Sequence, residues 1–515
     1  MVFDIQMGEN FRRKARLVAD GHLTNVPTSS TYSTVVSRDS VRICFLLAAL
    51  HGLELLAADV ENAYLNAPCR EKHWIRAGPE FGHDEGKVYL VVRALYGLRS
   101  SGAAFCAYLA EILDDIGFKS SIADPDVWIR QNTLPDGQKY YEYILVYVDD
   151  IICISHTPKE TMMQIAYRED DNDGSNVTFK KGKIAPPEMY LGATVQLKPL
   201  NDYMCWTMSS SSYVKAAIET ISEQLHKRSM KFNNRCNTPI LQGYRPELDN
   251  SQELEDEDVT FYQEMMGMLR WAIELGRVDI YHEVSILSSY QAAPRRGHLE
   301  QVINIFSYLR KNPKLTLYFD KQLPRYDETS FQGSPREDFK EIYRDAEEQV
   351  PTNAPTPLGS SVVITAFVDA SHGANQVTRR SHTGFVIFVN RAPILWYSKK
   401  QTTVETSTFS SELIALKTCM EHIISLRYKL RMFGVCIDGP ATVFCDNKTC
   451  VDCSSKFEAT LNKKHSSLAY HAVRHAVAAG IIRVLWIESG ENLADPFTKQ
   501  LTVSQRNYLF GNWTY

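Results

Sequence analysis

The sequence contains no apolar run of the roughly 18 to 20 residues that a membrane-spanning helix needs. It also opens without the charged leader and short apolar core that are typical of a secretion signal. Its eleven cysteines lack the regular spacing of a disulfide framework, which fits a reducing compartment. These absences predict a soluble protein inside the cell, in the cytoplasm or the nucleus, with no membrane partner.

An excess of one charge is also absent, because 56 Lys and Arg residues face 61 Asp and Glu residues, for a formal net charge of −5. This balance excludes a uniformly basic nucleic-acid coat but leaves room for a basic groove, since binding depends on local charge. Hydrophobic residues make up 44% of the chain and charged residues 23%, as in folded soluble proteins. A length of 515 residues exceeds one ordinary core and predicts two to four domains.

Changes in composition divide the chain into four parts, which cover residues 1–200, 201–320, 321–361 and 362–515. The first part is mixed α/β, although its polar, acidic stretch 168–182 is expected to be a surface loop. The second has helical spacing of apolar residues. The third is rich in Pro, Asp, Glu, Arg, Thr and Gly with little periodicity, which predicts a linker or insertion. The fourth shows three strands, a long helix and then alternating strands and helices, which predicts one compact domain.

Adjacent aspartates interrupt an apolar, strand-like stretch from Tyr143 to Ile154. Because neighbouring strand residues point to opposite faces, an extended Asp149-Asp150 pair would force one carboxylate into the core. A tight hairpin turn avoids this conflict and presents the acids at an exposed tip, which suits a divalent metal ion. An ordinary polar turn is the alternative, since aspartate favours turns.

A second acid shifts the balance towards a metal site. Asp59 ends the apolar run Leu55 to Ala58, and the aromatic Tyr64 follows five residues later. Carboxylates from separate strands are what a two-metal site for in-line phosphoryl transfer requires.

Four short motifs then follow one another in order. They are Lys14-Ala15-Arg16-Leu17-Val18-Ala19, Asp59-Val60-Glu61-Asn62-Ala63-Tyr64-Leu65-Asn66, Ala94-Leu95-Tyr96-Gly97-Leu98 and Tyr147-Val148-Asp149-Asp150. In this order they resemble the reverse transcriptases of copia-type retrotransposons, and weaker similarities continue to Arg277-Val278-Asp279-Ile280. The resemblance implies an α+β right-hand polymerase, with fingers and palm in residues 1–200 and a thumb or connection in 201–320.

The resemblance also implies roles for individual residues. Asp59, Asp149 and Asp150 would bind Mg²⁺ or Mn²⁺, and Tyr64 matches the aromatic residue beneath the incoming sugar, where its bulk favours deoxynucleoside triphosphates. Lys14 and Arg16 are candidates for gripping the triphosphate, with a solvated charged strand as the alternative. An RNA template and a DNA primer would be the other partners.

Two features depart from the family pattern. After Tyr96-Gly97-Leu98 the family usually continues with Lys-Gln-Ala-Pro-Arg-Ala-Trp, whereas this chain has Arg99-Ser100-Ser101-Gly102-Ala103-Ala104-Phe105. The family's template or nucleotide contacts are therefore not transferred to this segment. The chain also begins inside the fingers region, without protease, integrase or capsid segments, so we expect a fragment of a longer parent polyprotein with capsid and integrase, or a degenerate genomic copy.

Four acids in the last part form a second set. Asp369 closes an apolar strand, Asp446 follows the strand 442–445, Glu412 lies on the long helix, and Asp495 starts the final segment. Each alone has an ordinary explanation as a turn, a surface charge or a helix cap. A β-β-β-α-β fold would bring them together, and they resemble the Asp-Glu-Asp-Asp set of copia-type ribonuclease H. That resemblance implies an α/β ribonuclease H-like domain over 362–515, with two Mg²⁺ ions and an RNA–DNA hybrid as substrate.

A zinc site competes for part of this region. Cys450 and Cys453, followed by His465 and His471, have nearly the order of a structural zinc site. We favour a helix instead, because the cysteines directly follow the strand that ends at the candidate catalytic acid. Nearby basic residues predict a helix face towards the hybrid, or solvated charges; they are Lys463, Lys464, Arg474 and His475.

These patterns together predict an RNA-directed DNA polymerase of a retrotransposon that also degrades RNA in the hybrid. Two alternatives remain. The chain is either a catalytically silent nucleic-acid-binding relic, or a protein in which only the ribonuclease H is active.

Overall fold

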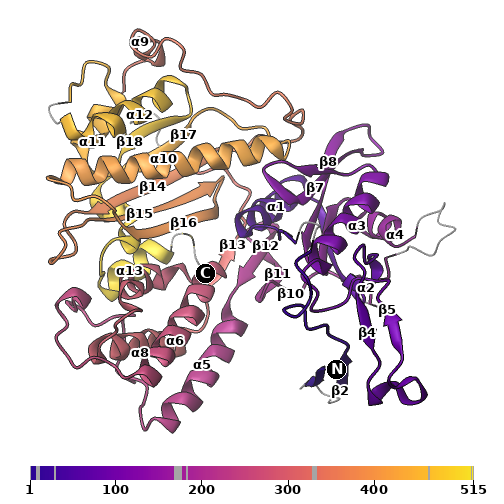
Figure 1. Cartoon of the computed structure of the whole chain (residues 1–515). Coiled ribbons are helices and arrows are strands. Elements are labelled where there is room, and N and C mark those ends of the chain that lie inside the picture. Colours follow the sequence, from indigo (N-terminus) through magenta and orange to yellow (C-terminus); the bar gives the residue numbers. More distant parts are fainter. Residues whose placement is uncertain are drawn as a thin grey trace. The chain divides into compact units, whose positions relative to one another are not determined.

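The computed structural model describes residues 2–6, 12–27, 31–167, 177–180, 184–326, 333–461, 464–511 and 513 (Figure 1). The chain divides into a first unit, Met1–Cys44 with Gly52–Pro187, and a second unit, Phe45–His51 with Glu188–Tyr515. Helix α1 (Arg38–His51) belongs to both, because its last turns pack in the second unit, where Phe45 meets the rings of Trp206 and Phe319. Within the described ranges, no helix has the length and apolar character to cross a membrane.

The first unit is built on an antiparallel sheet in the order β3-β9-β8-β7-β6. Its strands are β3 (Glu54–Asp59), β9 (Asp150–Ser155), β8 (Lys139–Tyr147), β7 (Asp124–Thr133) and β6 (Lys119–Ser121). Helices α3 (Ser101–Asp115) and α4 (Pro158–Ala166) share the main core with this sheet. Alternate strand residues such as Ile144 and Val146 supply the sheet's side of that core, as period-two strands require.

Smaller elements complete the first unit. The chain forms two short antiparallel ribbons and a single helical turn, namely β1 (Val2–Gln6) with β2 (Arg12–Arg16), β4 (Trp74–Arg76) with β5 (Val88–Leu90), and α2 (Ala63–Asn66). A 3₁₀ turn, η1 (Pro79–Asp84), lies between β4 and β5.

The second unit begins with a four-stranded sheet in the order β10-β11-β12-β13 and a group of helices. The strands are β10 (Met189–Tyr190), β11 (Ala193–Leu200), β12 (Tyr203–Ser209) and β13 (Thr316–Tyr318). The helices are α5 (Ser211–Lys227), α6 (Asp256–Glu274), α7 (Tyr281–Leu287) and α8 (Arg296–Lys311), with 3₁₀ turns η2 (Pro246–Leu248), η3 (Val278–Ile280) and η4 (Ser288–Tyr290).

These helices confirm the prediction made from the apolar spacing of the sequence. Residues such as Phe261, Met265 and Leu269 lie on one face of α6 and pack into one core. Residues 189–197 form a hairpin between β10 and β11. Leu191 and Gly192 both have positive φ, 51° and 86°, and turn the chain back on itself.

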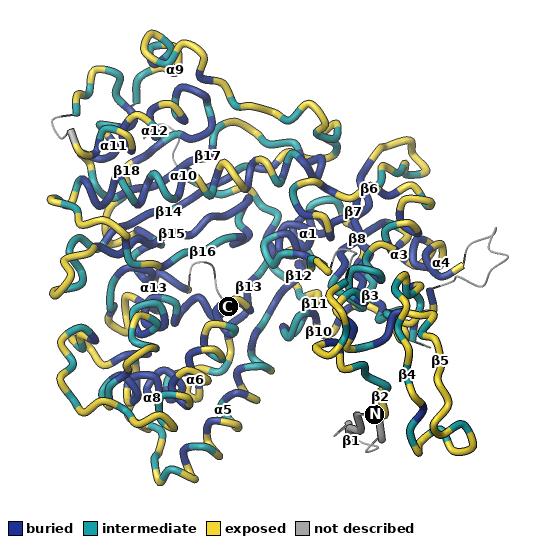
Figure 2. Tube along the Cα trace, in the orientation of Figure 1, coloured by how far each residue is buried: buried dark blue, intermediate teal, exposed yellow. Residues whose placement is uncertain are grey.

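The rest of the second unit is a five-stranded sheet in the order β16-β15-β14-β17-β18. Its strands are β14 (Ile364–Ser371), β15 (His382–Val389), β16 (Ala392–Lys400), β17 (Ala441–Cys445) and β18 (Ile482–Trp486). Strands β14, β15 and β16 are antiparallel neighbours, while β17 runs parallel to β14 and to β18. Figure 2 shows β14 and β15 buried along most of their length.

Helix α10 (Thr408–Met432) packs on β14 and β15, and Ser407 caps its first turn by accepting a hydrogen bond from the Ser410 backbone N–H. Shorter helical elements follow β17 and β18. They are α11 (Lys448–Ser455), η6 (Lys464–Ser466), α12 (Ser467–Ala478), η7 (Ser489–Glu491), η8 (Asp495–Phe497) and α13 (Val503–Gly511).

The described part of the segment 321–361 packs against the rest of the second unit. It contains the short helix α9 (Arg336–Phe339), whose Phe339 is fully buried. Glu348 accepts hydrogen bonds from Arg427 at 2.7 Å and also pairs with Arg431. Burial opposes ionisation, but the hydrogen bonds and charges of the two arginines prevail and lower the pKa of Glu348 to about 2. The segment therefore has anchoring contacts that its polar composition did not predict.

Candidate active sites: two sets of carboxylates

The predicted hairpin at Asp149-Asp150 is present. Tyr147 pairs with Asp150 across β8 and β9, so that Val148 and Asp149 form the turn. Val148 has a φ of 56°, in the left-handed region that a β-branched residue rarely adopts. Strain of this kind is concentrated at functional sites, which favours a specialised turn over an ordinary polar one.

Strand register brings Asp59 to the same place. β3 pairs with β9 so that Asp59 lies opposite Asp150, and the Val60 N–H donates to the Asp149 carbonyl at 2.8 Å. The Asp59 Oδ1 atom is buried and has no hydrogen-bond partner among the described residues, while Oδ2 accepts from the Lys180 ammonium. A buried carboxylate oxygen without a donor fits a bound cation.

Repulsion within this group is visible in the pKa of Asp150. Loss of water around the carboxyl group, and then the charges of Asp149 and Asp59, raise the pKa of Asp150 to about 6, with Lys180 acting in the opposite direction. Asp150 nevertheless keeps an exposed surface. The three aspartates thus form a solvent-facing group of negative charge that a divalent cation would neutralise.

Aromatic residues lie beside the acids. The Tyr64 ring is 4.9 Å from the Tyr96 ring and 6.3 Å from the Phe105 ring. Burial and then the charge of Asp149 raise the pKa of Tyr64, so the phenol stays protonated. The Arg16 guanidinium lies 5.9 Å from the centre of the Tyr96 ring. Tyr64 and Arg16 are therefore near the acids, whereas the side chain of Lys14 lies outside the described residues.

Close backbone contact joins two of the four motifs. The Ala19 N–H donates to the Tyr96 carbonyl at 2.7 Å, and Gly97 has a φ of 91°. A Cβ atom at Gly97 would lie 2.0 Å from the Ala19 carbonyl oxygen, so only glycine fits. The motifs Lys14 to Ala19 and Ala94 to Leu98 are therefore in direct backbone contact.

The altered segment 99–105 begins helix α3. Ser101 donates to the Leu95 carbonyl at 2.7 Å, and Ser100 donates to Glu71 at 3.2 Å. These hydroxyls are used to fix the start of the helix, and Phe105 is buried.

Lys180 was not among the residues that the sequence predicted. The expectation of a surface loop over 168–182 is wrong for its described part, because Val177 and Phe179 are buried in the core and Val60 forms a β-bridge with Phe179. The Lys180 N–H also donates to the Asp59 carbonyl at 3.0 Å. The alternation of Val177 and Phe179 with polar residues was the one sign of this short extended segment.

The second set gathers at one edge of the five-stranded sheet. Val368 pairs with Cys445 in the parallel register of β14 and β17, which places the next residues, Asp369 and Asp446, side by side. Asp369, Asp446 and Asp495 each offer an oxygen within 4.8 Å of the others. Glu412, from α10, similarly approaches Cys445 and Asp446. All four predicted acids therefore meet, from β14, α10, the end of β17 and η8.

One cation and two hydroxyl groups bond to the carboxylates of this set. The Lys499 ammonium lies 3.2 Å from Asp369 Oδ1 and 2.9 Å from Asp495 Oδ1. The Thr498 hydroxyl donates to Asp369 Oδ2, and the Ser489 hydroxyl donates to Asp446 Oδ2 at 2.8 Å. Lys499 and Thr498 were not predicted as site residues, although both stand in the segment that begins at Asp495.

Because the acids of the second set are buried or partly buried and lie close together, ionising all four without a bound cation is energetically unfavourable. Burial, followed by the charges of the neighbouring acids, raises the pKa of Glu412, and that of Asp495 to about 7. Burial also raises the pKa of Asp369, against the effect of Lys499. The Glu412 Oε2 atom is buried and has no partner among the described residues. Oxygen donors gathered in this way fit Mg²⁺ or Mn²⁺.

The zinc alternative finds no support in the described residues. Cys450 is buried, and the His471 Nδ1 atom is 2.7 Å from the Tyr343 hydroxyl. Among the described side chains, the groups close enough to hold a metal do not combine the two cysteines and two histidines of that pattern. The Cys445 thiol stays protonated, since a hydrogen bond with Cys450 and burial raise its pKa.

The expectation that Arg474 is part of a hybrid-facing or solvated helix face is wrong. Arg474 is 1% exposed and donates to the carbonyls of Cys453, Lys456 and Phe457. Its guanidinium lies 4.7 Å from the centre of the Phe339 ring. A side chain with three carbonyl acceptors within reach is held inside the fold by satisfied hydrogen bonds. His475 is exposed, and the side chains of Lys463 and Lys464 lie outside the described residues.

The fold and its two acidic groups define a protein with two candidate centres for divalent cations. Residues 3–242 match the family model of reverse transcriptase (RNA-dependent DNA polymerase). The chain is 24% identical over 500 residues to the Retrovirus-related Pol polyprotein from transposon RE1 of Arabidopsis thaliana, covering 95% of this chain and 30% of that relative. It is also 24% identical over 497 residues to the Retrovirus-related Pol polyprotein from transposon TNT 1-94 of Nicotiana tabacum, covering 95% and 33%.

These matches confirm the predicted resemblance to copia-type retrotransposon reverse transcriptase polyproteins. The chain spans about a third of the length of these two relatives. A solved structure, the N-terminal RNase H domain of rv2228c from Mycobacterium tuberculosis fused to maltose-binding protein, is 14% identical with a TM-score of 0.21, covering 30% of this chain and 99% of that chain.

Proposed function

We propose that the chain is an RNA-directed DNA polymerase of a retrotransposon that also cuts RNA in RNA–DNA hybrids. Two separate carboxylate sets support both activities, the first aligned by strand register and the second gathered with its oxygens within 4.8 Å in groups of three. Each set has a buried oxygen that lacks a donor among the described residues. Its partners would be an RNA template, a DNA primer, deoxynucleoside triphosphates and a parent polyprotein with capsid and integrase. Such a protein would act in cytoplasmic particles, in the nucleus, or in both.

In the first unit, Asp59, Asp149 and Asp150 would hold Mg²⁺ or Mn²⁺. Bound cations at such a site neutralise the triphosphate and lower the pKa of the attacking hydroxyl. Tyr64 would pack beneath the sugar and exclude a 2′-hydroxyl, and Arg16, beside Tyr96, would contact the phosphates. Lys180 holds Asp59 in place through its ammonium and its backbone N–H.

In the second unit, Asp369, Glu412, Asp446 and Asp495 would hold the cations about the scissile phosphate. Thr498 and Ser489 orient Asp369 and Asp446 by donating hydrogen bonds to them. The conformations of these carboxylates are therefore largely set before any cation or substrate binds, which reduces the reorganisation that binding requires.

Two assays test the proposal on the full chain. Primer extension on an RNA template should be lost in Asp149→Asn, and cleavage of a labelled RNA–DNA hybrid should be lost in Asp446→Asn. Asp136→Asn is a matched control for the first, because Asp136 occupies the ordinary β7–β8 turn and accepts from the Gln138 N–H at 2.9 Å. Glu421→Gln, on the exposed face of α10, is a control for the second.

The outcomes also separate the alternatives. Hybrid cleavage without primer extension would leave only the ribonuclease H active, and the altered segment 99–105 of the first unit would be the first place to seek the cause. Hybrid binding without either reaction would identify a silent relic.

A further inference from the structure

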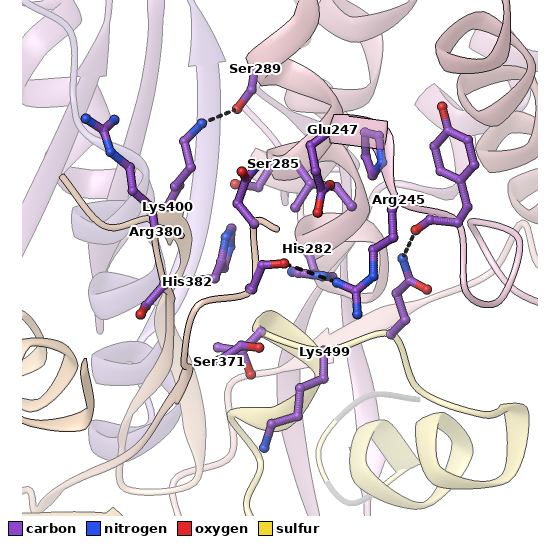
Figure 3. A pocket seen from close by; sticks show the side chains of 18 of the residues that line it. Arg245, Glu247, His282, Ser285, Ser289, Ser371, Arg380, His382, Lys400 and Lys499 are labelled. Carbon is purple, nitrogen blue, oxygen red and sulfur yellow. Dashed lines mark hydrogen bonds between the residues drawn. The ribbon is translucent and has the colours of Figure 1, made fainter. Parts of the chain in front are cut away.

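A cavity of about 290 Å³ lies next to the second carboxylate set, within the second unit (Figure 3). Residues 242–247 and helix α7 form one wall, and the loop 371–382 with the end of β16 forms the other. Thr498 and Lys499 line the cavity and also bond to Asp369. The cavity is therefore continuous with the surroundings of the candidate nuclease centre.

Cations outnumber carboxylates in its lining. Arg245, Arg380, Lys400 and Lys499 face a single acid, Glu247, whose Oε1 already accepts from the Gln376 N–H at 3.0 Å. Lys499 is held by Asp369 and Asp495, and the Arg245 guanidinium donates to the Ala374 carbonyl at 3.2 Å.

Two of these cations, Lys400 and Arg380, have neither a counter-ion nor a close hydrogen-bond acceptor among the described residues. The half-buried Lys400 ammonium has the Ser289 hydroxyl at 3.5 Å as its hydrogen-bond partner, at the outer limit of such a contact. The Arg380 guanidinium has no hydrogen-bond or ion-pair partner among the described residues. Lys400 and the exposed Arg380 therefore leave positive charge in the lining that its one carboxylate, Glu247, does not pair with.

The remaining polar lining is neutral. Burial lowers the pKa of His282 to about 4 and also lowers that of His382, so both imidazoles are uncharged near neutral pH. His282 is only 5% exposed, and its Nδ1 atom has no partner among the described residues. The Ser371 hydroxyl also lines the cavity. Positive charge in this cavity thus comes from arginine and lysine, the residues that bind phosphate oxygens.

We propose that this cavity binds a backbone phosphate of the nucleic-acid strand, close to the phosphodiester that the second carboxylate set would cut, with Arg380 and Lys400 as cationic donors. The inference rests on the proposed nuclease function and adds a positioning site to it. Holding a neighbouring phosphate fixes the register of the strand relative to the carboxylates, as phosphate contacts do without reading the base sequence.

Binding is tested first, on the full chain carrying Asp446→Asn, so that the hybrid is not cut. Adding Arg380→Gln and Lys400→Gln together should weaken binding of a short RNA–DNA hybrid about five- to tenfold. The slope of log Kd against log salt should also fall by roughly 0.9 per cation removed. Arg379→Gln and Lys399→Gln are matched controls, because each is an exposed neighbour that does not line the cavity, and the pair should change Kd less than about twofold.

The bound phosphate is then located with hybrids that carry one neutral methylphosphonate linkage at successive positions. One position near the cut should weaken binding to the Asp446→Asn chain about fivefold and have no further effect once Arg380 and Lys400 are replaced. Absence of any such coupled position would overturn the inference. A second contrary result is also possible. Millimolar inorganic phosphate would compete with the hybrid only when Arg380 and Lys400 are present, and no linkage would be coupled to them. That result would identify a free-phosphate site and would also overturn the inference.

The same series distinguishes this inference from the proposed function. If the unsubstituted chain does not cut hybrids but one linkage is coupled to Arg380 and Lys400, the phosphate site is retained and the proposed nuclease function is lost. Cleavage by the unsubstituted chain without coupling would retain the nuclease and remove the cavity. In a chain that cuts, the Arg380→Gln, Lys400→Gln pair should raise KM for the hybrid without changing the half-saturating Mg²⁺ concentration.

Discussion

The two carboxylate sets are assembled by different means. In the first unit, one hairpin turn and one neighbouring strand supply all three aspartates, so strand register alone brings them together, and Asp150 faces solvent. In the second unit, four separate elements supply the acids, and Asp369 and Glu412 are 1% and 6% exposed. The first set therefore depends on local geometry, whereas the second depends on tertiary packing. The second set also gathers negative charge away from water, which is energetically unfavourable.

The largest expected difference is in thermal stability when one acid of each set is replaced by its uncharged amide. Glu412→Gln should reduce hybrid cleavage by roughly two to three orders of magnitude. It should also raise the thermal stability of the metal-free chain, because it removes a charge that burial and neighbouring acids oppose. Asp149→Asn should reduce primer extension as strongly but leave the melting temperature within about 1 °C, since surface changes shift stability little.

Activity assays and melting curves without and with Mg²⁺ measure both effects. Glu421→Gln, whose side chain pairs with Lys417 on the surface, is the control. A lower melting temperature for metal-free Glu412→Gln would contradict the view that this set stores repulsion.

The two sites should also treat the 2′-hydroxyl in opposite ways. The first should exclude it through Tyr64, whose ring packs against Tyr96 and Phe105, while the second should require it. Tyr64→Val should raise incorporation of ribonucleotides relative to deoxynucleotides about tenfold or more, because an added hydroxyl is rejected only by steric contact. Competition between labelled nucleotides measures the ratio, and hybrid cleavage should be unchanged. Unaltered selectivity would remove Tyr64 from the sugar site.

A smaller effect should distinguish the two lysines. Lys499 occupies oxygens of Asp369 and Asp495 that a cation would use, so Lys499→Gln should lower the half-saturating Mg²⁺ concentration for hybrid cleavage about threefold. Lys180→Gln should act in the same direction on primer extension, through Asp59. Titration of each activity with Mg²⁺ tests this, and Lys417→Gln is a surface control. A higher requirement in either variant would show that the lysine supports the cation instead of competing with it.

The smallest expected effect is the pH dependence of stability in metal-free chain. Asp495 and Asp150 have pKa values raised to about 7 and about 6, from an ordinary value of 3.8. The folded chain therefore holds protons that the unfolded chain has released, and the free energy of unfolding falls as pH rises from about 4. The fall should end near pH 7 in the second unit and near pH 6 in the first.

Each raised pKa unit corresponds to about 1.4 kcal/mol at most, and solvent screening should make the loss smaller at the exposed Asp150. Hydrogen exchange resolved by unit, with EDTA, measures the two losses separately. Added Mg²⁺ should reverse the trend, because cations favour the ionised acids. Equal stability at pH 5 and pH 8 without metal would contradict the proposed charge repulsion.

Local patterns predicted much of the secondary structure. The strand before Asp446 and the long helix that carries Glu412 are both present, as β17 and α10, because buried faces repeat with fixed spacing. Positions of charged groups were less predictable. Arg474 and Lys180 both belong to polar stretches, yet one is enclosed by carbonyl groups and the other is bonded to Asp59.

The sequence by itself determined the hairpin at Asp149-Asp150, since two adjacent acids between apolar strands cannot both avoid the core unless the chain turns. It also predicted the resemblance to reverse transcriptase polyproteins, through motifs whose order survives at 24% identity. Only the tertiary structure decided which cations face these acids, which cations remain unpaired beside the cavity, and that part of 321–361 is packed. These properties depend on contacts between residues far apart in the chain, and periodicity along the chain carries no information about them.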